Sequence, residues 1–231
     1  MSTAQSVVFL FDVDNTLFDN DALQAQLTAY LTDTFGEATD ARYWALFEQL
    51  RSQLGYADYL GALERLRLES PDDPRLLGAA FFFMDYPFAR GVYPGALAAL
   101  ARCAQVGPTV ILSDGDAVFQ PLKVRSAGLW EAVGGRVLIY VHKEQMLADV
   151  ARHYPAAHYV LVDDKVRILD AVKQVWGVQV TTVFPRQGHY ALDAAELARY
   201  RPPDITIGSI AELVGCSLGP LSGAPTLQKV R

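Results

Sequence analysis

The chain has 231 residues, of which 51% are hydrophobic, and its 20 basic and 26 acidic side chains give a formal net charge of −6. This composition is typical of a globular protein and excludes disordered and fibrous architectures. The sequence pI is about 5.2 and the sequence lacks a Lys/Arg cluster. We therefore expect no nucleic-acid polymer as a partner, because nonspecific binding to phosphate backbones requires a positive surface.

The sequence also predicts a cytoplasmic protein without a membrane partner. The N-terminus has no basic segment, and Asp12 interrupts the first apolar run before it could serve as the core of a signal peptide. The richest apolar stretch, Leu77–Met84, is far shorter than a membrane-spanning helix. Cys103 and Cys216 are the only cysteines, which is too few for a disulfide framework. Nothing in the sequence predicts an oligomeric state.

The first predicted element is a buried strand at Val7–Phe11, an apolar run rich in strand-forming residues. The segment 18–88 shows no strand pattern and has two apolar series at helical spacing: Leu23, Leu27 and Leu31, then Tyr43, Phe47, Leu50 and Leu54. We interpret residues 18–88 as an inserted all-helical cap. Bend-forming residues at Gly91–Gly95 lead the chain back.

Strands and helices alternate after the insertion. Further strands are predicted at Thr109–Leu112, Val137–Val141, Tyr159–Val162 and Val178–Phe184, and helices at Gly95–Ala104, Ala117–Ala127, Lys143–His153 and Arg167–Trp176. This alternation predicts an α/β fold with a doubly wound parallel sheet, which binds ligands at the carboxyl ends of its strands. The expected domains are a core of residues 1–17 and 89–216, the cap, and a loosely structured C-terminal tail of residues 217–231.

Two carboxylates follow the first strand, in the segment Asp12-Val13-Asp14-Asn15-Thr16. Side chains two residues apart on a strand point to the same side, so Asp12 and Asp14 are expected to share one crevice. The alternative interpretation is that they cap the following turn or helix.

Ser113-Asp114-Gly115-Asp116 follows the second predicted core strand. The hydroxyl of Ser113 and the amides of Asp114 and Gly115 could hold a phosphate group at this strand-to-helix turn. An ordinary helix cap formed by Ser113 or Asp114 explains the same residues equally well.

A second acidic pair, Asp163-Asp164, ends another predicted strand. Adjacent like charges are costly, and a cation bound between this pair and the first would relieve that cost. Mg²⁺ suits such a site, since it binds a few carboxylates, waters and phosphate oxygens. Lys143 lies one helix and one strand earlier and could balance phosphate charge, with Lys123 as a weaker competitor. A solvated acidic turn and a solvated lysine are the alternatives.

The order of these motifs, with a helical insertion after the first, resembles the haloacid dehalogenase (HAD) superfamily. The resemblance implies a Rossmann-like core, a helical cap of the type that closes over small substrates, a nucleophile at Asp12 and a general acid/base at Asp14. It implies Mg²⁺ held by Asp12, Asp14, Asp163 and Asp164, and phosphate contacts from Thr16, Ser113, Asp114, Gly115 and Lys143. The doublet departs from the Gly-Asp of many members but also occurs in the family. By its place in the motif Asp164 is the preferred inner ligand, with Asp163 supporting it.

The resulting functional prediction is Mg²⁺-dependent hydrolysis of a small phosphorylated metabolite through an aspartyl-phosphate on Asp12. A phosphotransferase or mutase would use the same motifs with a different acceptor. A dehalogenase would use the same nucleophile, but halide needs no acid to depart, and dehalogenases of this superfamily lack a residue like Asp14. A non-catalytic binding protein that retains the fold is the remaining alternative.

Overall fold

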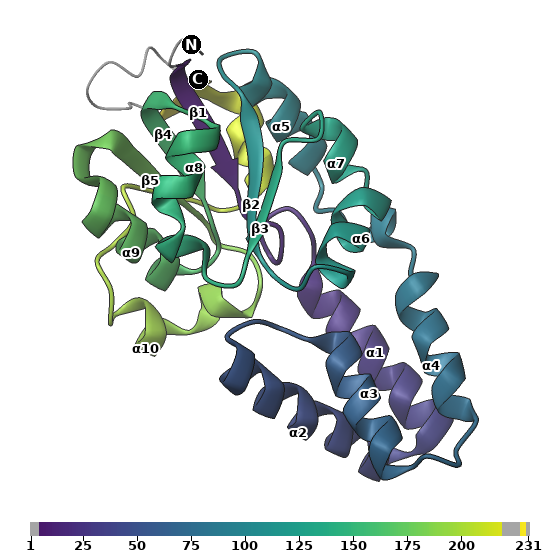
Figure 1. The fold of residues 1–231 in the computed structure, drawn as a ribbon. Coiled ribbons are helices and arrows are strands. Elements are labelled where there is room, and N and C mark those ends of the chain that lie inside the picture. The colour runs from purple at the N-terminus through teal and green to yellow at the C-terminus, as the bar shows by residue number, and fades with distance from the viewer. Residues whose placement is uncertain (1–4, 219–226, 230–231) are drawn as a thin grey trace.

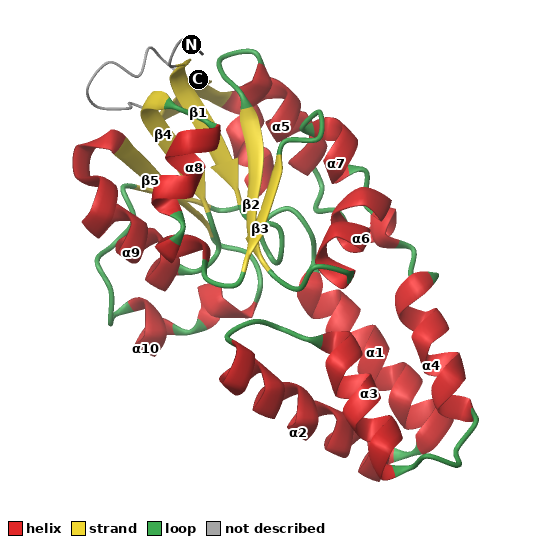
Figure 2. Cartoon of the chain, viewed as in Figure 1, coloured by secondary structure: helices red, strands yellow, loops and turns green. Residues whose placement is uncertain are grey.

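The computed structural model describes residues 5–218 and 227–229. Its centre is a six-stranded parallel sheet of order β3-β2-β1-β4-β5-β6 (Figures 1 and 2). The strands are β1 (Gln5–Phe11), β2 (Thr109–Asp114), β3 (Val137–Tyr140), β4 (Ala156–Val162), β5 (Val180–Pro185) and β6 (Ile205–Ile207). β1 lies inside the sheet, with Phe11 paired to Ile111 on one side and to Val162 on the other. Its carboxyl end is therefore flanked by the ends of β2 and β4.

Helices cover both faces of the sheet. Val7, Phe9 and Phe11 point to one face, where they join the core of α5 (Ala96–Ala104), α6 (Phe119–Ser126) and α7 (Leu129–Ala132). Val8 and Leu10 point to the other, toward α8 (Leu147–His153) and α9 (Val166–Trp176). This alternation is the period of two that a strand imposes, and burial on both faces explains why the strands read as continuous apolar runs.

Four helices lie beyond the carboxyl ends of the strands (Figure 1): α1 (Asn20–Phe35), α2 (Glu37–Leu54), α3 (Tyr59–Glu69) and α4 (Arg75–Met84). The carboxylates of Asp19 and Asp58 cap α1 and α3 by accepting hydrogen bonds from the amides of Ala22 and Gly61. Leu23, Leu27 and Leu31 are fully buried, as their helical spacing predicts. The predicted α/β fold with an inserted helical cap is confirmed, whereas the domain boundaries remain a prediction.

Among its differences from the predicted elements, the structure departs at β2, at Lys143–His153 and at β6. β2 continues through Ser113 and Asp114, so these residues end the strand and do not follow it. The stretch Lys143–His153 is a 3₁₀ turn at Lys143–Gln145 followed by α8. β6 was not predicted, because its three residues, preceded by Pro202 and Pro203, are too short to show a strand period.

The predicted C-terminal tail lies partly outside the described residues, which omit 219–226 and 230–231. β7 (Cys216–Leu218) pairs antiparallel with β8 (Leu227–Lys229). A short helix, α10 (Ala194–Leu197), follows β5. Within the described ranges, no helix combines the length and the apolar character needed to cross a membrane.

Candidate active site

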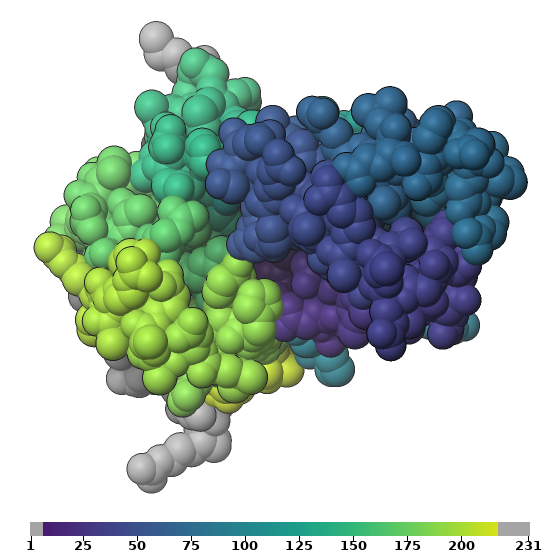
Figure 3. Space-filling model, turned by 90° about the horizontal axis from the view of Figure 1, so that it is seen from below, coloured from purple at the N-terminus to yellow at the C-terminus, as the bar shows by residue number. Residues whose placement is uncertain are grey.

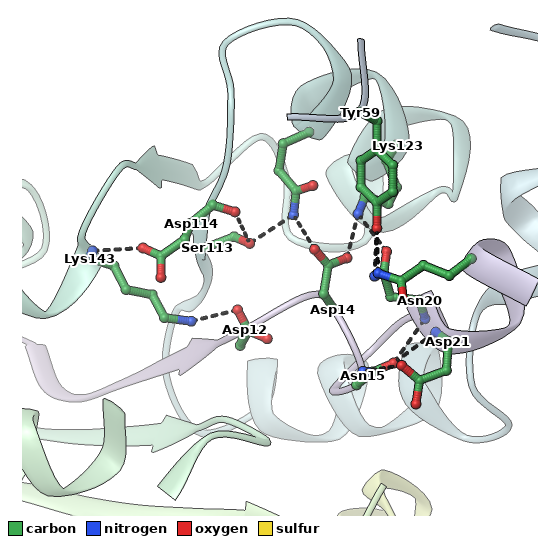
Figure 4. A network of polar contacts seen from close by, with 12 residues as sticks. Asp12, Asp14, Asn15, Asn20, Asp21, Tyr59, Ser113, Asp114, Lys123 and Lys143 are labelled. Atoms are coloured by element: carbon green, nitrogen blue, oxygen red, sulfur yellow. Dashed lines mark hydrogen bonds and ion pairs between the residues drawn. The ribbon is translucent and has the colours of Figure 1, made fainter. Parts of the chain in front are cut away.

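Asp12 lies directly beyond β1, and its side chain is almost completely buried. Its amide donates to the carbonyl of Val162 at the end of β4, which continues the sheet pairing by one residue. The ammonium of Lys143 lies 2.5 Å from Asp12 Oδ1 (Figure 4). It also lies 2.6 Å from Asp163 Oδ2. The 3₁₀ turn after β3 carries Lys143, and its amide donates to Asp114 Oδ1 at 2.7 Å. The ends of three strands thus position the Asp12–Lys143 pair.

Three carboxylates form a buried cluster that fits a divalent cation. One oxygen each from Asp12, Asp163 and Asp164 lie within 4.8 Å of one another. Neither carboxylate oxygen of Asp164 has a hydrogen-bond partner in the described part of the chain, and Asp12 Oδ2 has none either. Buried anionic oxygens without partners are costly, so a bound cation would supply what the protein does not. Hard oxygen donors of this kind suit Mg²⁺ or a similar ion.

The pKa values reflect the same crowding. Burial raises the pKa of Asp163 and of Asp164, and the neighbouring Asp12 carboxylate raises both further. Burial alone would lower the pKa of Lys143, but the carboxylates of Asp12 and Asp163 hold it well above its usual value. Lys143 therefore stays charged while it offsets only part of the negative charge of the cluster.

The structure separates the two acidic residues within the predicted site. Asp163 Oδ1 accepts from the amide of Lys165 at 2.8 Å, and Asp163 Oδ2 faces Lys143. The amide of Asp164 donates to Thr16 Oγ1 at 3.0 Å, which fixes the backbone beside an unpaired carboxylate. These contacts favour Asp164 as the inner ligand. Thr16 is fully buried, and its hydroxyl accepts from the amide of Asp164. This contact differs from the phosphate contact that the sequence predicts for Thr16.

Asp14 is turned away from the carboxylate cluster. Its Oδ1 lies 2.5 Å from the ammonium of Lys123, and its Oδ2 accepts a 3.4 Å hydrogen bond from Gln120 (Figure 4). Among the described residues, the acidic group that could hold a metal does not include the carboxylate of Asp14, so the metal-ligand role of Asp14 stays a prediction. The side chain of Asp14 is 22% exposed and lines a cavity. Its position fits proton exchange with a bound molecule.

The predicted phosphate-binding turn is only partly available. Ser113 lies beside the site and its Oγ accepts from Gln120 Nε2 at 2.9 Å. The amide of Gly115 donates to the carbonyl of Tyr140, so it is not free to bind phosphate as expected. The carboxylate of Asp114 accepts from the amide of Lys143. Burial raises the pKa of Asp114, although the charge of Lys143 opposes that shift. Asp114 thus positions Lys143.

A cavity of about 430 Å³ lies between the helical insertion and the sheet edge. Its walls include Asp14, Asp114 and Lys165 from strand ends, Arg51 and Tyr56 from the insertion, and His189 and Tyr190 from the loop after β5. Seen from below, the blue surface of the insertion borders green and yellow-green core surface, with purple N-terminal residues visible between them (Figure 3). The cavity is therefore built from both parts of the chain.

Comparison with known proteins identifies the family. No protein-family model and no curated protein matches the sequence. The solved structure of a haloacid dehalogenase-like hydrolase from Burkholderia xenovorans LB400 is 59% identical over 91% of this chain and 95% of that chain, with a TM-score of 0.87. This chain belongs to the haloacid dehalogenase-like hydrolases. The family resemblance predicted from the motif order is confirmed.

Two more distant structures share the fold of this haloacid dehalogenase-like hydrolase. An L-2-haloacid dehalogenase from Xanthobacter autotrophicus with covalently bound chloropropionic acid is 21% identical, covers 90% of this chain and 96% of its own, and has a TM-score of 0.58. A HAD hydrolase from Bacillus subtilis bound to magnesium is 16% identical, with coverages of 90% and 97% and the same TM-score.

Sequence reasoning did not predict the residues that surround Asp14 in this HAD-like hydrolase. Gln120 and Lys123 lie three residues apart on α6, and both are buried polar residues that contact Asp14. The sequence predicts Lys123 only as a weaker competitor of Lys143 for balancing phosphate charge. The sequence did contain an indication of their burial. Residues three apart share a helix face, and Gln120 and Lys123 lie beside the apolar residues Phe119 and Val124, which are buried. Asn20 and Tyr59, in the insertion, had no comparable signal.

Proposed function

We propose that this HAD-like hydrolase cleaves the phosphate monoester of a small metabolite with the aid of Mg²⁺, using Asp12 as the nucleophile. The observation that carries the proposal is the second carboxylate, Asp14, which lies on the same sheet edge as Asp12 but is partly exposed and lines the cavity. Departure of an alkoxide from phosphorus needs a proton donor, and this position suits one.

The buried carboxylates of Asp12, Asp163 and Asp164 would hold the Mg²⁺ ion. When bound, the ion would supply positive charge that lets a phosphate dianion approach a carboxylate. The magnesium-bound hydrolase from Bacillus subtilis, which shares the fold, is consistent with this assignment.

The side chains divide the reaction between them. A carboxylate oxygen of Asp12 attacks phosphorus to give an aspartyl-phosphate while the bond to the leaving oxygen breaks. Lys143, bound to Asp12, offsets negative charge as the reactants meet. Ser113 would hold a phosphoryl oxygen once its hydroxyl turns from the carbonyl of Asp114, to which it donates at 3.2 Å. Asp14 donates a proton to the leaving oxygen, then takes one from the water that attacks phosphorus and frees Asp12. A phosphotransferase or mutase would differ only in the acceptor.

Dehalogenation is the second candidate, because the Xanthobacter autotrophicus enzyme with bound chloropropionic acid shares the fold. Halide leaves as a stable anion and uses no proton donor. A partly exposed carboxylate at Asp14 and three crowded carboxylates on the sheet edge have no task in that reaction. These features support the phosphatase assignment for this chain.

A screen of phosphorylated metabolites, with an aryl phosphate and L-2-chloropropionic acid included, tests the proposal. We expect phosphate release that requires Mg²⁺ and stops with excess EDTA. Chloride release without phosphate release would instead support the dehalogenase, and phosphate release in excess EDTA would contradict the metal assignment. Inclusion of sugar phosphate acceptors distinguishes hydrolysis from phosphoryl transfer.

A further inference from the structure

Lys123 is a fully buried lysine outside the carboxylate cluster. Its ammonium lies 2.5 Å from Asp14 Oδ1 and 3.2 Å from the amide oxygen of Asn20 (Figure 4). The rings of Phe18 and Phe119 flank it, with centroids 5.7 and 5.6 Å from Nζ. Burial of an ammonium is costly unless it is paired, so this arrangement fixes both the lysine and the groups that it contacts.

Direct contact between Lys123 and a substrate does not fit this geometry. The ammonium of Lys123 is held by Asp14 and Asn20 between two aromatic rings, whereas the ammonium of Lys143 contacts Asp12 and Asp163 of the carboxylate cluster. Asp14 itself is partly exposed and lines the cavity. Any effect of Lys123 on the reaction is therefore exerted through Asp14. Phosphate charge balance belongs to Lys143, which contacts Asp12.

The contacts of Lys123 continue into the helical insertion. Asn20 begins α1, and its Nδ2 donates to the hydroxyl of Tyr59 at 3.0 Å. Tyr59 begins α3, is buried, and also accepts from Gln24 Nε2 at 2.9 Å. A continuous chain of polar contacts thus runs from Asp14 through Lys123 and Asn20 to the third helix of the insertion.

We propose that Lys123 is a positioning residue that holds the Asp14 carboxylate at the site of proton transfer, and that Asn20 and Tyr59 tie this position to the helical insertion. The inference rests on the proposed function, because it assigns the leaving-group proton to Asp14. Loss of Lys123 should affect the chemical step, and it should do so most when the leaving group needs a proton.

The first test compares Lys123→Met and Lys123→Arg with Asp14→Asn on an alkyl and an aryl phosphate. Lys123→Met should lower kcat on the alkyl phosphate by about 100-fold with little change in KM, and much less on the aryl phosphate. Lys123→Arg, which keeps a donor for Asp14, should recover part of the loss. Lys123→Met should add little in the Asp14→Asn background, because both changes remove one function.

Lys173→Met serves as the matched control, since Lys173 pairs with Asp204 and lies away from the cavity. It should leave kcat and its dependence on the leaving group unchanged. Equal losses on both esters, or additive losses in the double variant, would overturn the positioning role of Lys123. If Lys123→Met fails to fold, Tyr59→Phe tests the same chain of contacts and should give a smaller loss of the same kind.

Hydrogen exchange provides a readout that does not depend on turnover. Backbone hydrogen bonds hold the loop after β1. The amides of Leu17 and Phe18 donate to the carbonyl of Val13, and the amide of Asn15 donates to the carbonyl of Phe18. Lys123→Met and Tyr59→Phe should speed exchange of these amides relative to wild type and to Lys173→Met. Unchanged exchange of these amides would overturn the proposed network, whether or not the wild-type protein cleaves a phosphate ester. Absence of phosphate ester cleavage would instead reject the proposed function.

Discussion

Asp12 and Asp14 have different partners although one residue separates them. Asp12 faces Lys143 and the buried carboxylates, whereas Asp14 faces Lys123, Gln120 and the cavity. The turn between them and α1 depends on Asn15, whose backbone has φ of 58° and whose Oδ1 accepts from the amides of Asn20 and Asp21. Asn tolerates this left-handed conformation better than most residues. The local turn thus gives two similar carboxylates separate environments.

Asp14→Asn tests whether Asp14 donates the proton to the leaving oxygen. Asn has nearly the same shape but cannot donate a proton to a departing oxygen, so kcat on an alkyl phosphate should fall by a factor of about 100 to 10,000. The loss should be much smaller on an aryl phosphate, whose leaving group departs without a proton. Steady-state kinetics on the two esters measures this, and equal losses would contradict the role.

The motif order was enough to predict Asp12, Asp163, Asp164 and Lys143 as neighbours. Each follows a parallel strand or the turn after one, so they had to meet at one sheet edge. The partner of Asp14 could not be predicted in this way. Lys123 reaches it from α6, 109 positions later in the chain, and only the packing of that helix decides which carboxylate it meets.

The strands and the helices of the insertion could be predicted because their buried positions produce a regular pattern of apolar residues in the sequence. The short β6 and the 3₁₀ turn at Lys143–Gln145 were not, because three residues carry no period. That turn matters, since it directs Lys143 back over the ends of β1 and β2. The presence of helices was thus predictable, whereas the short turn that places the Lys143 side chain was not.

The loop after β5 contacts the insertion across the cavity. Arg51, in the last turn of α2, donates to the hydroxyl of Tyr190 in the loop after β5 at 2.6 Å. The same loop approaches the first motif closely: a Cβ on Gly188, at φ of 68°, would lie 2.5 Å from Cβ of Asn15. Glycine is therefore required where this loop passes the active-site turn.

Tyr190→Phe removes the hydrogen bond by which Arg51 of the insertion contacts the loop after β5. Loss of one hydrogen bond to a charged group costs about 1 kcal/mol or more, which corresponds to roughly a fivefold rise in KM for the best metabolite. Mg²⁺ dependence should not change, because the candidate ligands lie on the sheet edge. Tyr154→Phe, on a tyrosine that does not line this cavity, is the control. An unchanged KM would show that this contact does not govern substrate binding.

At the scale of the whole molecule, the sheet brings together carboxylates that are 151 and 152 positions apart in sequence, Asp12 with Asp163 and Asp164. Burial raises the pKa values of Asp163 and Asp164, and one oxygen of Asp12 and both oxygens of Asp164 have no hydrogen-bond partner among the described residues. The metal-free protein therefore carries a cost that a bound cation would remove. Stability should consequently depend on both metal and pH.

Because these pKa values are raised on folding, the folded state holds protons that the unfolded chain has released, so the metal-free protein loses stability as pH rises above the ordinary aspartate pKa. Mg²⁺ must displace those protons, so its stabilising effect should grow with pH. At 100 times its Kd, Mg²⁺ should raise Tm by roughly 5–10 °C near neutral pH. Thermal melts at about pH 5.5 and about pH 7.5, with and without Mg²⁺, measure this; a larger effect at the lower pH would contradict it.

Detection of the covalent intermediate tests whether Asp12 is the nucleophile. The protein is mixed with its best phosphate ester and Mg²⁺, quenched in acid within one turnover, digested and examined by mass spectrometry. We predict one phosphoryl group on the peptide that contains Asp12, present in wild type and absent in Asp12→Asn, which should fold but lose turnover by several orders of magnitude. Phosphate release without phosphoryl transfer to Asp12, together with near wild-type turnover by Asp12→Asn, would contradict the account.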